Sequence, residues 1–333
     1  MSSRRDYDVV VATGGLGSGI FLALEGNATL GREESRAAEL LDQRDYCKLH
    51  IVCHYVAKLL GPGFPVVPIG KVGDDDAGRS VRAELAGVGI QTDHVTGSAL
   101  PTLFSVCFLY PDGDGGNLTT SRSASSDVSP ADVQRARPVF VAYHDRGVAL
   151  ALPEVPLAAR AELLRLGREY GFLRVAGVVT GEVAEARDSG MLADVDLLAV
   201  NVDEARALVL DSAPRSSPAD DVDAAVRELT RLNPRLSVVV TAGADGSWTW
   251  DGQRLEHVPA LPVEVVNTAG AGDAHLAAVV VGLVRGLDLV TANFYAAVVS
   301  GLAVTSRHTI NAEIDAASVA EAAERHGRGG GGG

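Results

Sequence analysis

Short apolar runs bounded by glycine, proline and other turn residues recur along the first three quarters of the chain. Runs of this length that are rich in β-branched residues predict buried β-strands. The segment NLTT follows the turn PDGDGG and predicts a partner for the strand at 103–110, and WTWDGQRLEHV predicts a hairpin around Asp251-Gly252. The predicted strands of the apolar runs span residues 8–12, 66–72, 103–110, 138–143, 173–179, 195–200 and 236–242.

Segments with apolar residues at helical spacing separate most of these runs. Val222, Val226 and Leu229 keep this spacing in one segment, and Val81 and Leu85 keep it after the turn GDDDAG. Strands that alternate with helices predict parallel βαβ units, so we expect an α/β fold, a three-layer α/β/α sandwich with a mostly parallel central sheet. The predicted helices of this part span 156–170, 203–210 and 219–232, the last of which holds Val222, Val226 and Leu229. The chain from about residue 272 is also predicted to be helical.

The chain has no internal repeat and no clear linker. Its 333 residues, of which 47% are hydrophobic, can bury one large core, so we predict a single domain over residues 1–328. Polar, turn-rich segments near 14–50 and 98–122 are expected to form a small β lid. The glycine tail at 329–333 has no side chains to pack and is expected to be disordered.

Charge and cysteine content limit the classes of partner. The formal net charge is −14, which argues against nucleic acid because no basic surface is available for phosphates. No uncharged apolar run reaches the ~18 residues of a membrane span. The three cysteines are an odd number in a long chain, which indicates a reducing compartment, so we expect a cytoplasmic protein.

A glycine-rich stretch near the start, VVVATGGLGSGIFL, invites comparison with a dinucleotide-binding fold. That fingerprint needs glycines at G-x-G-x-x-G. Counting from Gly15 places the third glycine at Ile20, and counting from Gly14 places the second at Leu16. The stretch therefore fits better with glycines that let two backbones pass closely.

The stretch NTAGAGDAH, at 267–275, carries the strongest chemical signal. A helix start exposes unpaired N–H groups, and glycines ahead of it let an anion approach, so Gly270 and Gly272 indicate an anion cradle. It is not a Walker A loop, because His275 and Leu276 stand where lysine and serine or threonine would follow. Asp273 suits a base beside a transferring phosphate. An aspartate that merely caps the helix after a flexible turn is the competing interpretation.

NTAGAGDAH resembles the signature D-T-x-G-A-G-D-x-F of the ribokinase-like, PfkB-type carbohydrate and nucleoside kinases. Five further stretches resemble that family in the same order, so the resemblance covers about residues 61–306. These stretches are GKVGDDDAG, GVGIQTDHV, PTLFSVCFLYPDGDGG, NVDE at 201–204 and VVVTAGADGSW.

The resemblance implies an ATP-dependent phosphotransferase that acts on a hydroxyl of a sugar or sugar-like molecule. Asp273 would be the catalytic base, and Gly270, Ala271, Gly272 and the amide of Asp273 would form the anion hole. The implied partners are therefore ATP and a small-molecule acceptor, with Mg²⁺ as cofactor. A nucleoside kinase of the same fold and a non-catalytic sugar- or nucleotide-binding relative are the alternatives.

The resemblance also implies residues for the metal and the nucleotide. Asn201 and Glu204 would organise Mg²⁺ and the phosphates, largely through water, and an Asn and a Glu three residues apart can share one helix face. A plain helix start with acidic caps is the competing interpretation. The residues expected around the nucleotide are Thr241, Gly243, Gly246 and Ala297.

The chain departs from the family on the substrate side. Gly17 and Gly19 stand where the family has an Asn and an Asp that bind sugar hydroxyls. With Asn27 and Lys48 they are the predicted acceptor-side positions. Asn267 replaces the first Asp of the signature, which helps hold a monovalent cation in many relatives, so cation dependence is uncertain.

The stretch at 25–48 leaves the charge of the acceptor open. Arg32, Arg36, Arg44 and Lys48 could favour an anionic acceptor, or they could pair with acidic neighbours on a solvated surface. The strand LFSVCFLY at 103–110 carries more apolar side chains than a strand exposed on both faces can tolerate, so we expect a partner subunit or the main body to cover it. A homodimer through the lid would cover it, and so would burial in the central sheet.

Overall fold

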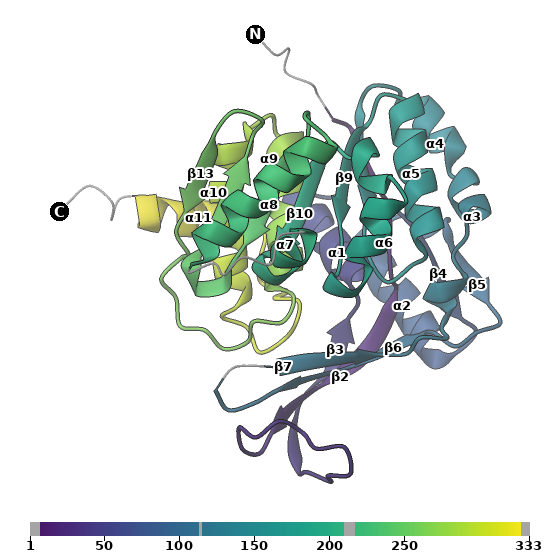
Figure 1. Ribbon diagram of the computed structural model, residues 1–333. Coiled ribbons are helices and arrows are strands. Elements are labelled where there is room, and N and C mark those ends of the chain that lie inside the picture. Colours follow the sequence, from purple (N-terminus) through teal and green to yellow (C-terminus); the bar gives the residue numbers. More distant parts are fainter. Residues whose placement is uncertain (1–6, 113–114, 210–216, 328–333) are drawn as a thin grey trace.

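Two β-sheets organise the chain in the computed structural model, which describes residues 7–112, 115–209 and 217–327 (Figure 1). The predicted glycine tail lies outside these residues. The main sheet has nine strands in the order β13-β12-β11-β10-β9-β8-β1-β4-β5, and only β12 and β13 run antiparallel to their neighbours. Its strands are β1 Val9–Thr13, β4 Val66–Gly73, β5 Val95–Ser98, β8 Gly147–Ala151, β9 Leu173–Gly177, β10 Leu197–Asn201, β11 Ser237–Thr241, β12 Ser247–Trp250 and β13 Leu255–Val258.

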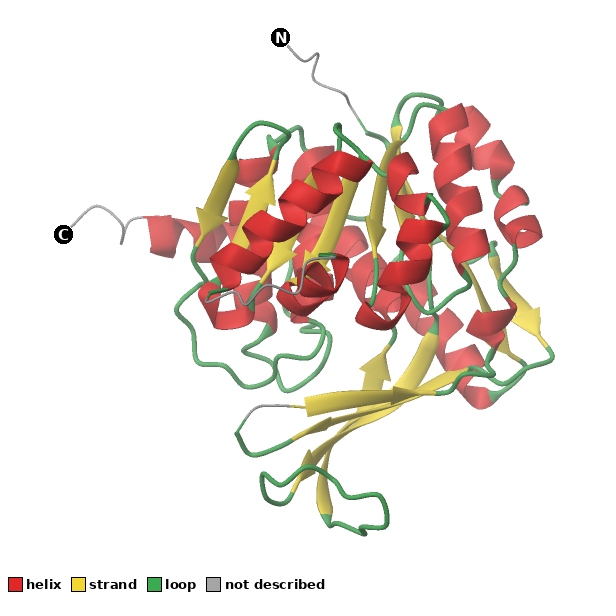
Figure 2. Cartoon of the chain, viewed as in Figure 1, coloured by secondary structure: helices red, strands yellow, loops and turns green. Residues whose placement is uncertain are grey.

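A second, four-stranded sheet projects from the main body, as Figure 2 shows; we call it the small sheet. Its order is β3-β2-β6-β7. All four strands come from the two segments that the sequence analysis assigned to a lid, whereas the chain from Lys48 onward returns to the body as a helix. The strands are β2 Gly17–Leu24, β3 Ala38–Tyr46, β6 Leu103–Leu109 and β7 Gly115–Thr119.

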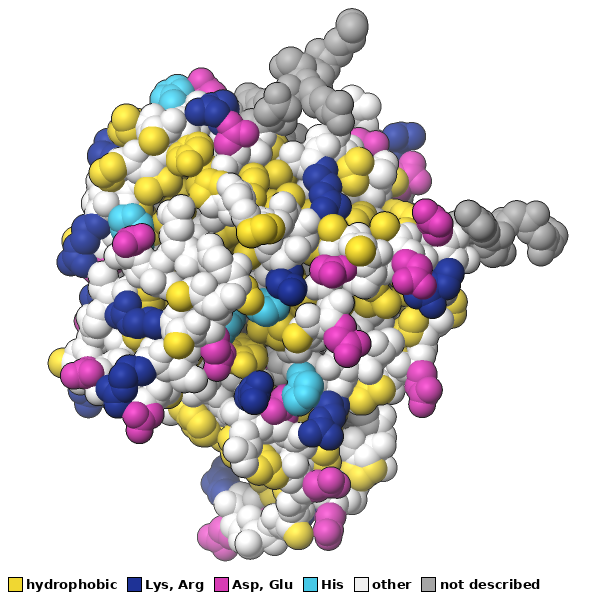
Figure 3. All heavy atoms as spheres, turned by 180° about the vertical axis from the view of Figure 1, so that it is seen from behind, with side chains coloured by type: hydrophobic (Ala, Val, Ile, Leu, Met, Phe, Trp, Pro, Cys, Tyr) yellow, Lys and Arg dark blue, Asp and Glu magenta, His cyan; other side chains and the backbone are white. Residues whose placement is uncertain are grey.

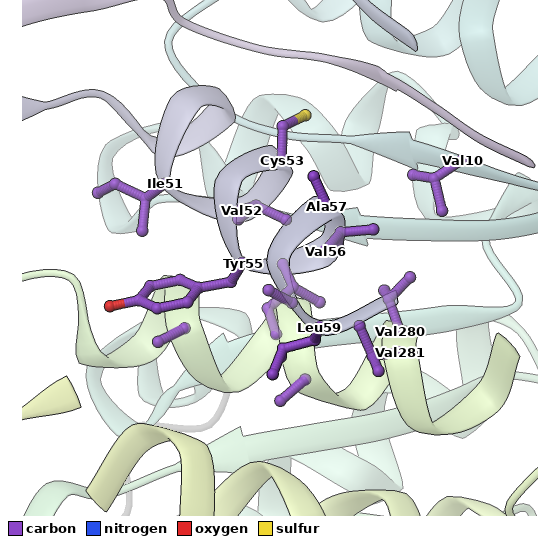
Figure 4. Close-up of a cluster of buried hydrophobic side chains, with 14 of the residues drawn as sticks. Val10, Ile51, Val52, Cys53, Tyr55, Val56, Ala57, Leu59, Val280 and Val281 are labelled. Carbon is purple, nitrogen blue, oxygen red and sulfur yellow. The ribbon is translucent and has the colours of Figure 1, made fainter. Parts of the chain in front are cut away.

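Helices cover both faces of the main sheet, and each face has its own hydrophobic core. On one face, Leu59 of α1 lies beside Val280 and Val281 of α9 (Figure 4). Helix α9 is apolar all round, as expected for a helix that other elements enclose. The helices of this face are α1 Lys48–Leu60, α2 Asp76–Gly87, α9 Ala271–Val284, α10 Leu289–Ala303 and α11 Ala316–Gly327.

The opposite core is built from the other face of the same strands and from the helices of the middle of the chain. Val9 and Val11 of β1 point into it, whereas Val10 points into the first core, as alternation along a strand requires. The helices of this face are α3 Pro130–Gln134, α4 Arg137–Ala142, α5 Leu157–Glu169, α6 Val183–Asp188, α7 Val202–Leu208 and α8 Pro218–Leu232.

The predicted three-layer α/β sandwich with a mostly parallel sheet is confirmed. One predicted strand is wrong, because residues 138–143 lie in or beside α4. Pro138 stands in the first turn of that helix, where its missing N–H costs nothing. Phe140 is fully buried while Val141 is exposed, which is a one-sided helical pattern.

The molecular surface agrees with an acidic protein that offers no basic face on the side shown in Figure 3. Lysine and arginine side chains alternate there with aspartate and glutamate. Among the described residues, the helices are too short or too polar to cross a bilayer.

The joint between the small sheet and the body is tied by Asp75, the N-cap of α2. Its carboxylate accepts hydrogen bonds from the amide of Gly78 at 2.8 Å, the amide of Thr102 at 2.8 Å and the hydroxyl of Thr102 at 2.5 Å. Thr102 directly precedes β6, and its hydroxyl oxygen also accepts from the amide of Gly73 at 2.9 Å. One carboxylate therefore fixes a helix start and the entry into the small sheet.

Replacing Asp75 with alanine is expected to lower the free energy of unfolding by about 1–3 kcal/mol, because two amides and a hydroxyl lose their acceptor. Although burial raises it, the hydrogen bonds from Thr102 and Gly78 lower the pKa of Asp75 below its usual value. The stabilisation is therefore present above that usual value and lost as the pH falls below it. Denaturant unfolding measures the effect, with the fully exposed Asp74→Ala as control. Equal losses in both variants would contradict this assignment.

Candidate active site

A cleft of about 820 Å³ opens at the carboxyl ends of the parallel strands. Strands β8 to β11 end on one side of it, and α9 begins on the other. This edge is where ligands bind in open α/β sheets. All the residues predicted for the nucleotide, the metal, the anion hole and the base line the cleft, and so does Lys48. These residues are Asn201, Glu204, Thr241, Gly243, Gly246, Ala297, Gly270, Ala271, Gly272 and Asp273.

The turn at the start of α9 has the backbone that an anion site needs. Gly270 is the N-cap and has a left-handed φ of 77°. A side chain there would be strained, and its Cβ would lie 2.7 Å from the carbonyl oxygen of Thr309. The amide of Ala271 donates to the carbonyl of Thr268 at 3.2 Å, so it is already engaged. The amides of Gly272 and Asp273, in the first helical turn, have no such partner within the described chain.

Asp273 lies in this first turn with its carboxylate facing the cleft. One of its oxygens is 3.5 Å from the amine nitrogen of Lys48. Burial raises the pKa of the Asp273 carboxyl above its usual value, and the positive charge of Lys48 partly offsets that increase. Asp273 also raises the pKa of the Lys48 amine, despite burial. Each group of the pair therefore favours the charged form of the other, while burial disfavours the charge on Asp273.

Lys48 reaches this position because it is the first residue of α1, directly after the small sheet. Its backbone amide donates to a carboxylate oxygen of Glu154 at 3.1 Å. The sequence analysis missed Glu154, which follows β8 by three positions. Its backbone is left-handed, with φ of 73°, which costs energy for a residue with a side chain. Burial raises the pKa of Glu154 to about 7, although Lys48 opposes the increase.

Asn201 and Glu204 form a reciprocal cap at the start of α7. The amide of Asn201 donates to Glu204 at 2.8 Å, and the amide of Glu204 donates to the side-chain oxygen of Asn201 at 2.8 Å. Burial raises the pKa of Glu204 to about 7. The capping interpretation is thus confirmed, and both residues still line the cleft. A Glu204 oxygen beyond the cap can order water around a cation. Within the described chain, no three acidic, His or Cys side chains are placed so that they could hold a metal ion directly.

One end of the cleft is mainly apolar. Its walls come from the segment after β13 and from α10, and the apolar residues that line it include Ala260, Leu261, Pro262, Val263, Val265, Ala297 and Gly301. His275 also lines this end and is buried. Its ring nitrogens contact Ser300 at 3.2 Å and Asn293 at 2.8 Å, and burial lowers its pKa to about 4. A neutral histidine therefore replaces the phenylalanine of the signature.

The predicted acceptor-side residues other than Lys48 do not line the cleft. A Cβ on Gly17 would lie 2.3 Å from the carbonyl oxygen of Leu103, and one on Gly19 would lie 2.3 Å from the hydroxyl of Ser105. These glycines serve the close approach of β2 to β6, as the sequence favoured. Asn27 accepts a hydrogen bond from the amide of Asp112 at 3.0 Å, in a loop beyond the end of β2.

The glycine-rich start is not a dinucleotide fold, because β1 leads into strand β2 and not into a helix. The family model for the pfkB family of carbohydrate kinases matches residues 52–316. The chain belongs to the pfkB carbohydrate kinase family. The cleft described above therefore lies in a kinase fold, with the signature turn at one wall.

Relatives within this kinase family are distant. The chain is 29% identical over 254 residues to the bifunctional protein HldE of Bradyrhizobium diazoefficiens, covering 72% of this chain and 48% of that protein. It is 24% identical over 244 residues to the ribokinase of Bacillus subtilis, covering 73% and 76%. The chain thus spans about half the length of the HldE proteins that it matches.

Solved kinases share the fold at lower identity. Ribokinase from Giardia lamblia superposes with a TM-score of 0.79 at 17% identity, over 97% of this chain and 100% of that one. A Burkholderia thailandensis nucleoside kinase in complex with inosine gives a TM-score of 0.71 at 14% identity, over 96% and 98%. At these identities the similarity establishes the fold.

Glu154 generates a pH prediction. Because its folded-state pKa of about 7 lies above the usual value of a glutamate, its protonated form stabilises the fold, and that stabilisation is lost as the pH rises through about 7. Glutamine cannot ionise, so the Glu154→Gln variant should not lose this stabilisation. The difference in free energy of unfolding between the variant and the unchanged protein should therefore shift in favour of the variant as the pH rises from about 5 to about 8. Denaturant titrations across this range test the idea, and parallel pH profiles of the two proteins would refute it.

Proposed function

We propose that this kinase transfers the γ-phosphoryl group of ATP to a hydroxyl of a sugar or sugar-like small molecule, with Asp273 as the base. The observation that carries the proposal is the position of Asp273. Its carboxylate stands at the start of a buried helix, beside two first-turn amides without backbone partners and 3.5 Å from the Lys48 amine. A base, an anion cradle and a cation thus share one wall of the cleft.

The chemistry follows from these three groups. Asp273 accepts the proton of the acceptor hydroxyl, whose oxygen then forms a bond to the γ-phosphorus as the bond from that phosphorus to the β-phosphate oxygen breaks. The amides of Gly272 and Asp273 donate to the oxygens of the transferring group. The Lys48 amine compensates part of the charge that gathers there.

We assign Mg²⁺ and the phosphates of the nucleotide to the side of the cleft that Asn201 and Glu204 line, with water between these residues and the ion. Thr241, Gly243 and Gly246 border the same region, and the apolar walls around Ala297 suit a purine ring. When bound, the ion would neutralise phosphate charge and help align the reacting oxygens. The three free cysteines suit a reducing compartment, and we place the protein in the cytoplasm.

A neutral polyhydroxyl acceptor fits the charges better than an anionic one. Lys48 already faces the carboxylate of Asp273 and lies near that of Glu154. Arg36 binds Glu34 and the carbonyl of Ala28, in the loop between β2 and β3, away from the residues that line the cleft.

Asp273→Asn should lower turnover by about 10²–10⁴, the usual effect of losing a positioned base, while nucleotide binding and the fold persist. A coupled assay of ADP release with a panel of sugars gives turnover, and calorimetry with Mg–ADP gives binding. Asp203→Asn changes an exposed acid in the first turn of α7 and is the matched control, expected to turn over like the unchanged protein. Normal turnover by Asp273→Asn would refute the assignment of the base.

The outer face of the small sheet supports a further part of the proposal, a homodimer. Strand pairing places Ile20 beside Val106, Leu22 beside Phe108, and Leu118 beside Val106, all on one face. Three large apolar side chains remain exposed on this sheet: Leu40 at 46%, Phe104 at 40% and Leu118 at 65%. An apolar sheet face of this kind favours burial against a second copy.

The double variant F104E/L118E should therefore be monomeric where the unchanged protein is a dimer. Light scattering after size-exclusion chromatography measures the mass. Leu232→Glu alters a leucine at the end of α8 that is as exposed as Phe104, at 40%, and should leave the dimer intact. A monomeric unchanged protein at micromolar concentration would contradict the dimer.

A further inference from the structure

Asn267 is a buried amide that ties the anion-hole turn to the loop after α10. Only 4% of its surface is exposed. Its backbone amide donates to the carbonyl of Val304 at 3.1 Å, and its side-chain nitrogen donates to the carbonyl of Arg307 at 3.1 Å. Its side-chain oxygen accepts from the amide of Ala269 at 2.8 Å. One residue thus joins the turn at 267–270 to the loop at 304–309.

The same loop touches both the anion hole and the small sheet. The carbonyl oxygen of Thr309 packs against Gly270, at 2.7 Å from where a Cβ would stand. The Thr309 hydroxyl donates to Asp45 of β3 at 3.0 Å, and the ring of His308 contacts Asp42 of β3 at 2.5 Å. A displacement of this loop would therefore move the N-cap of α9. It would also weaken the hydrogen bonds that join the loop to β3.

The partners of Asn267 fix the direction of its amide. The amide of Ala269 can only donate, so the side-chain oxygen must face it, and the side-chain nitrogen then faces the carbonyl of Arg307. A carboxylate at this position would present oxygen to that carbonyl oxygen, and the two acceptors repel each other unless a proton or a cation lies between them. The monovalent cation implied by the family resemblance does not fit here, because the N–H group points at the oxygen that would bind it.

We propose that Asn267 is a positioning residue that holds the loop at 304–309 against the anion-hole turn in place of a monovalent cation. Nucleotide binding by this chain then requires neither K⁺ nor Na⁺. The nucleotide part of the inference rests on the proposed kinase function, whereas the structural part concerns the fold alone.

The test compares three proteins in KCl and in tetramethylammonium chloride at equal ionic strength. The unchanged protein should have the same midpoint of thermal unfolding and the same affinity for Mg–ADP in both salts. Asn267→Asp should bind Mg–ADP about ten-fold more weakly than the unchanged protein in tetramethylammonium, because its carboxylate oxygen would face the carbonyl oxygen of Arg307. It should regain most of that affinity in KCl, where K⁺ can lie between the two oxygens. Asn267→Ala should be weakened in both salts, because it offers no ligand to a cation.

Asn233 offers a matched control. It is buried, its side-chain nitrogen donates to the carbonyl of Val195 at 2.8 Å, and its oxygen accepts from the amide of Arg235 at 3.2 Å. Asn233 does not line the cleft, so Asn233→Asp should lower the unfolding temperature without changing the affinity for Mg–ADP in either salt. This separates a local loss of stability from an effect on the anion hole.

Three results would overturn the inference: K⁺-dependent unfolding or binding in the unchanged protein, an Asn267→Asp variant as good as the unchanged protein in tetramethylammonium, or one that KCl does not rescue. The unfolding measurement is made without nucleotide. If the unchanged protein bound no Mg–ADP in either salt, the kinase proposal would fail. The unfolding temperatures of Asn267→Asp in the two salts would still decide the inference, with a higher value in KCl supporting it.

Discussion

The ion pair between Lys48 and Asp273 is the interaction on which the arrangement of the site depends. It joins the first residue of α1 to the first turn of α9, two helices that pack side by side in one core. Glu154 and Glu204 also raise the pKa of the Lys48 amine. Several carboxylates thus share one half-buried cation, and none of them could be removed from water so readily without it.

This shared charge explains why the site is assembled from distant parts of the chain. Lys48 reaches the cleft because α1 begins directly after strand β3 of the small sheet. Glu154 accepts a hydrogen bond from the backbone amide of the same lysine. The left-handed backbone at Glu154 indicates that its position is maintained against a local cost. The strands thus supply a rigid edge, and the segments after them supply the charges.

Local pattern was enough to predict the layers of the fold, and the family resemblance named residues that the structure brings together along one cleft. β1 and β10 are dense apolar runs, and Asn201 and Glu204 form the cap that their spacing implies. Local pattern did not predict features that depend on contacts between distant parts of the chain. The run around Phe140 is apolar enough for a strand, but Pro138 and one-sided burial make it a helix. Glu154 carried no local signal beyond its place after an apolar segment, since its partner lies 106 positions away.

The enclosure of α9 has a consequence for the partial charge at its amino end. Every residue from Ala274 to Gly282 is buried, and α1 and α10 pack along the helix. Dissolved ions therefore cannot approach its axis, so the partial charge at its amino end is shielded only from the cleft side. A higher ionic strength should then weaken the long-range attraction of a charged ligand toward the cleft. It should have a much smaller effect on the interaction between the helix and an anion that is already bound at its amino end.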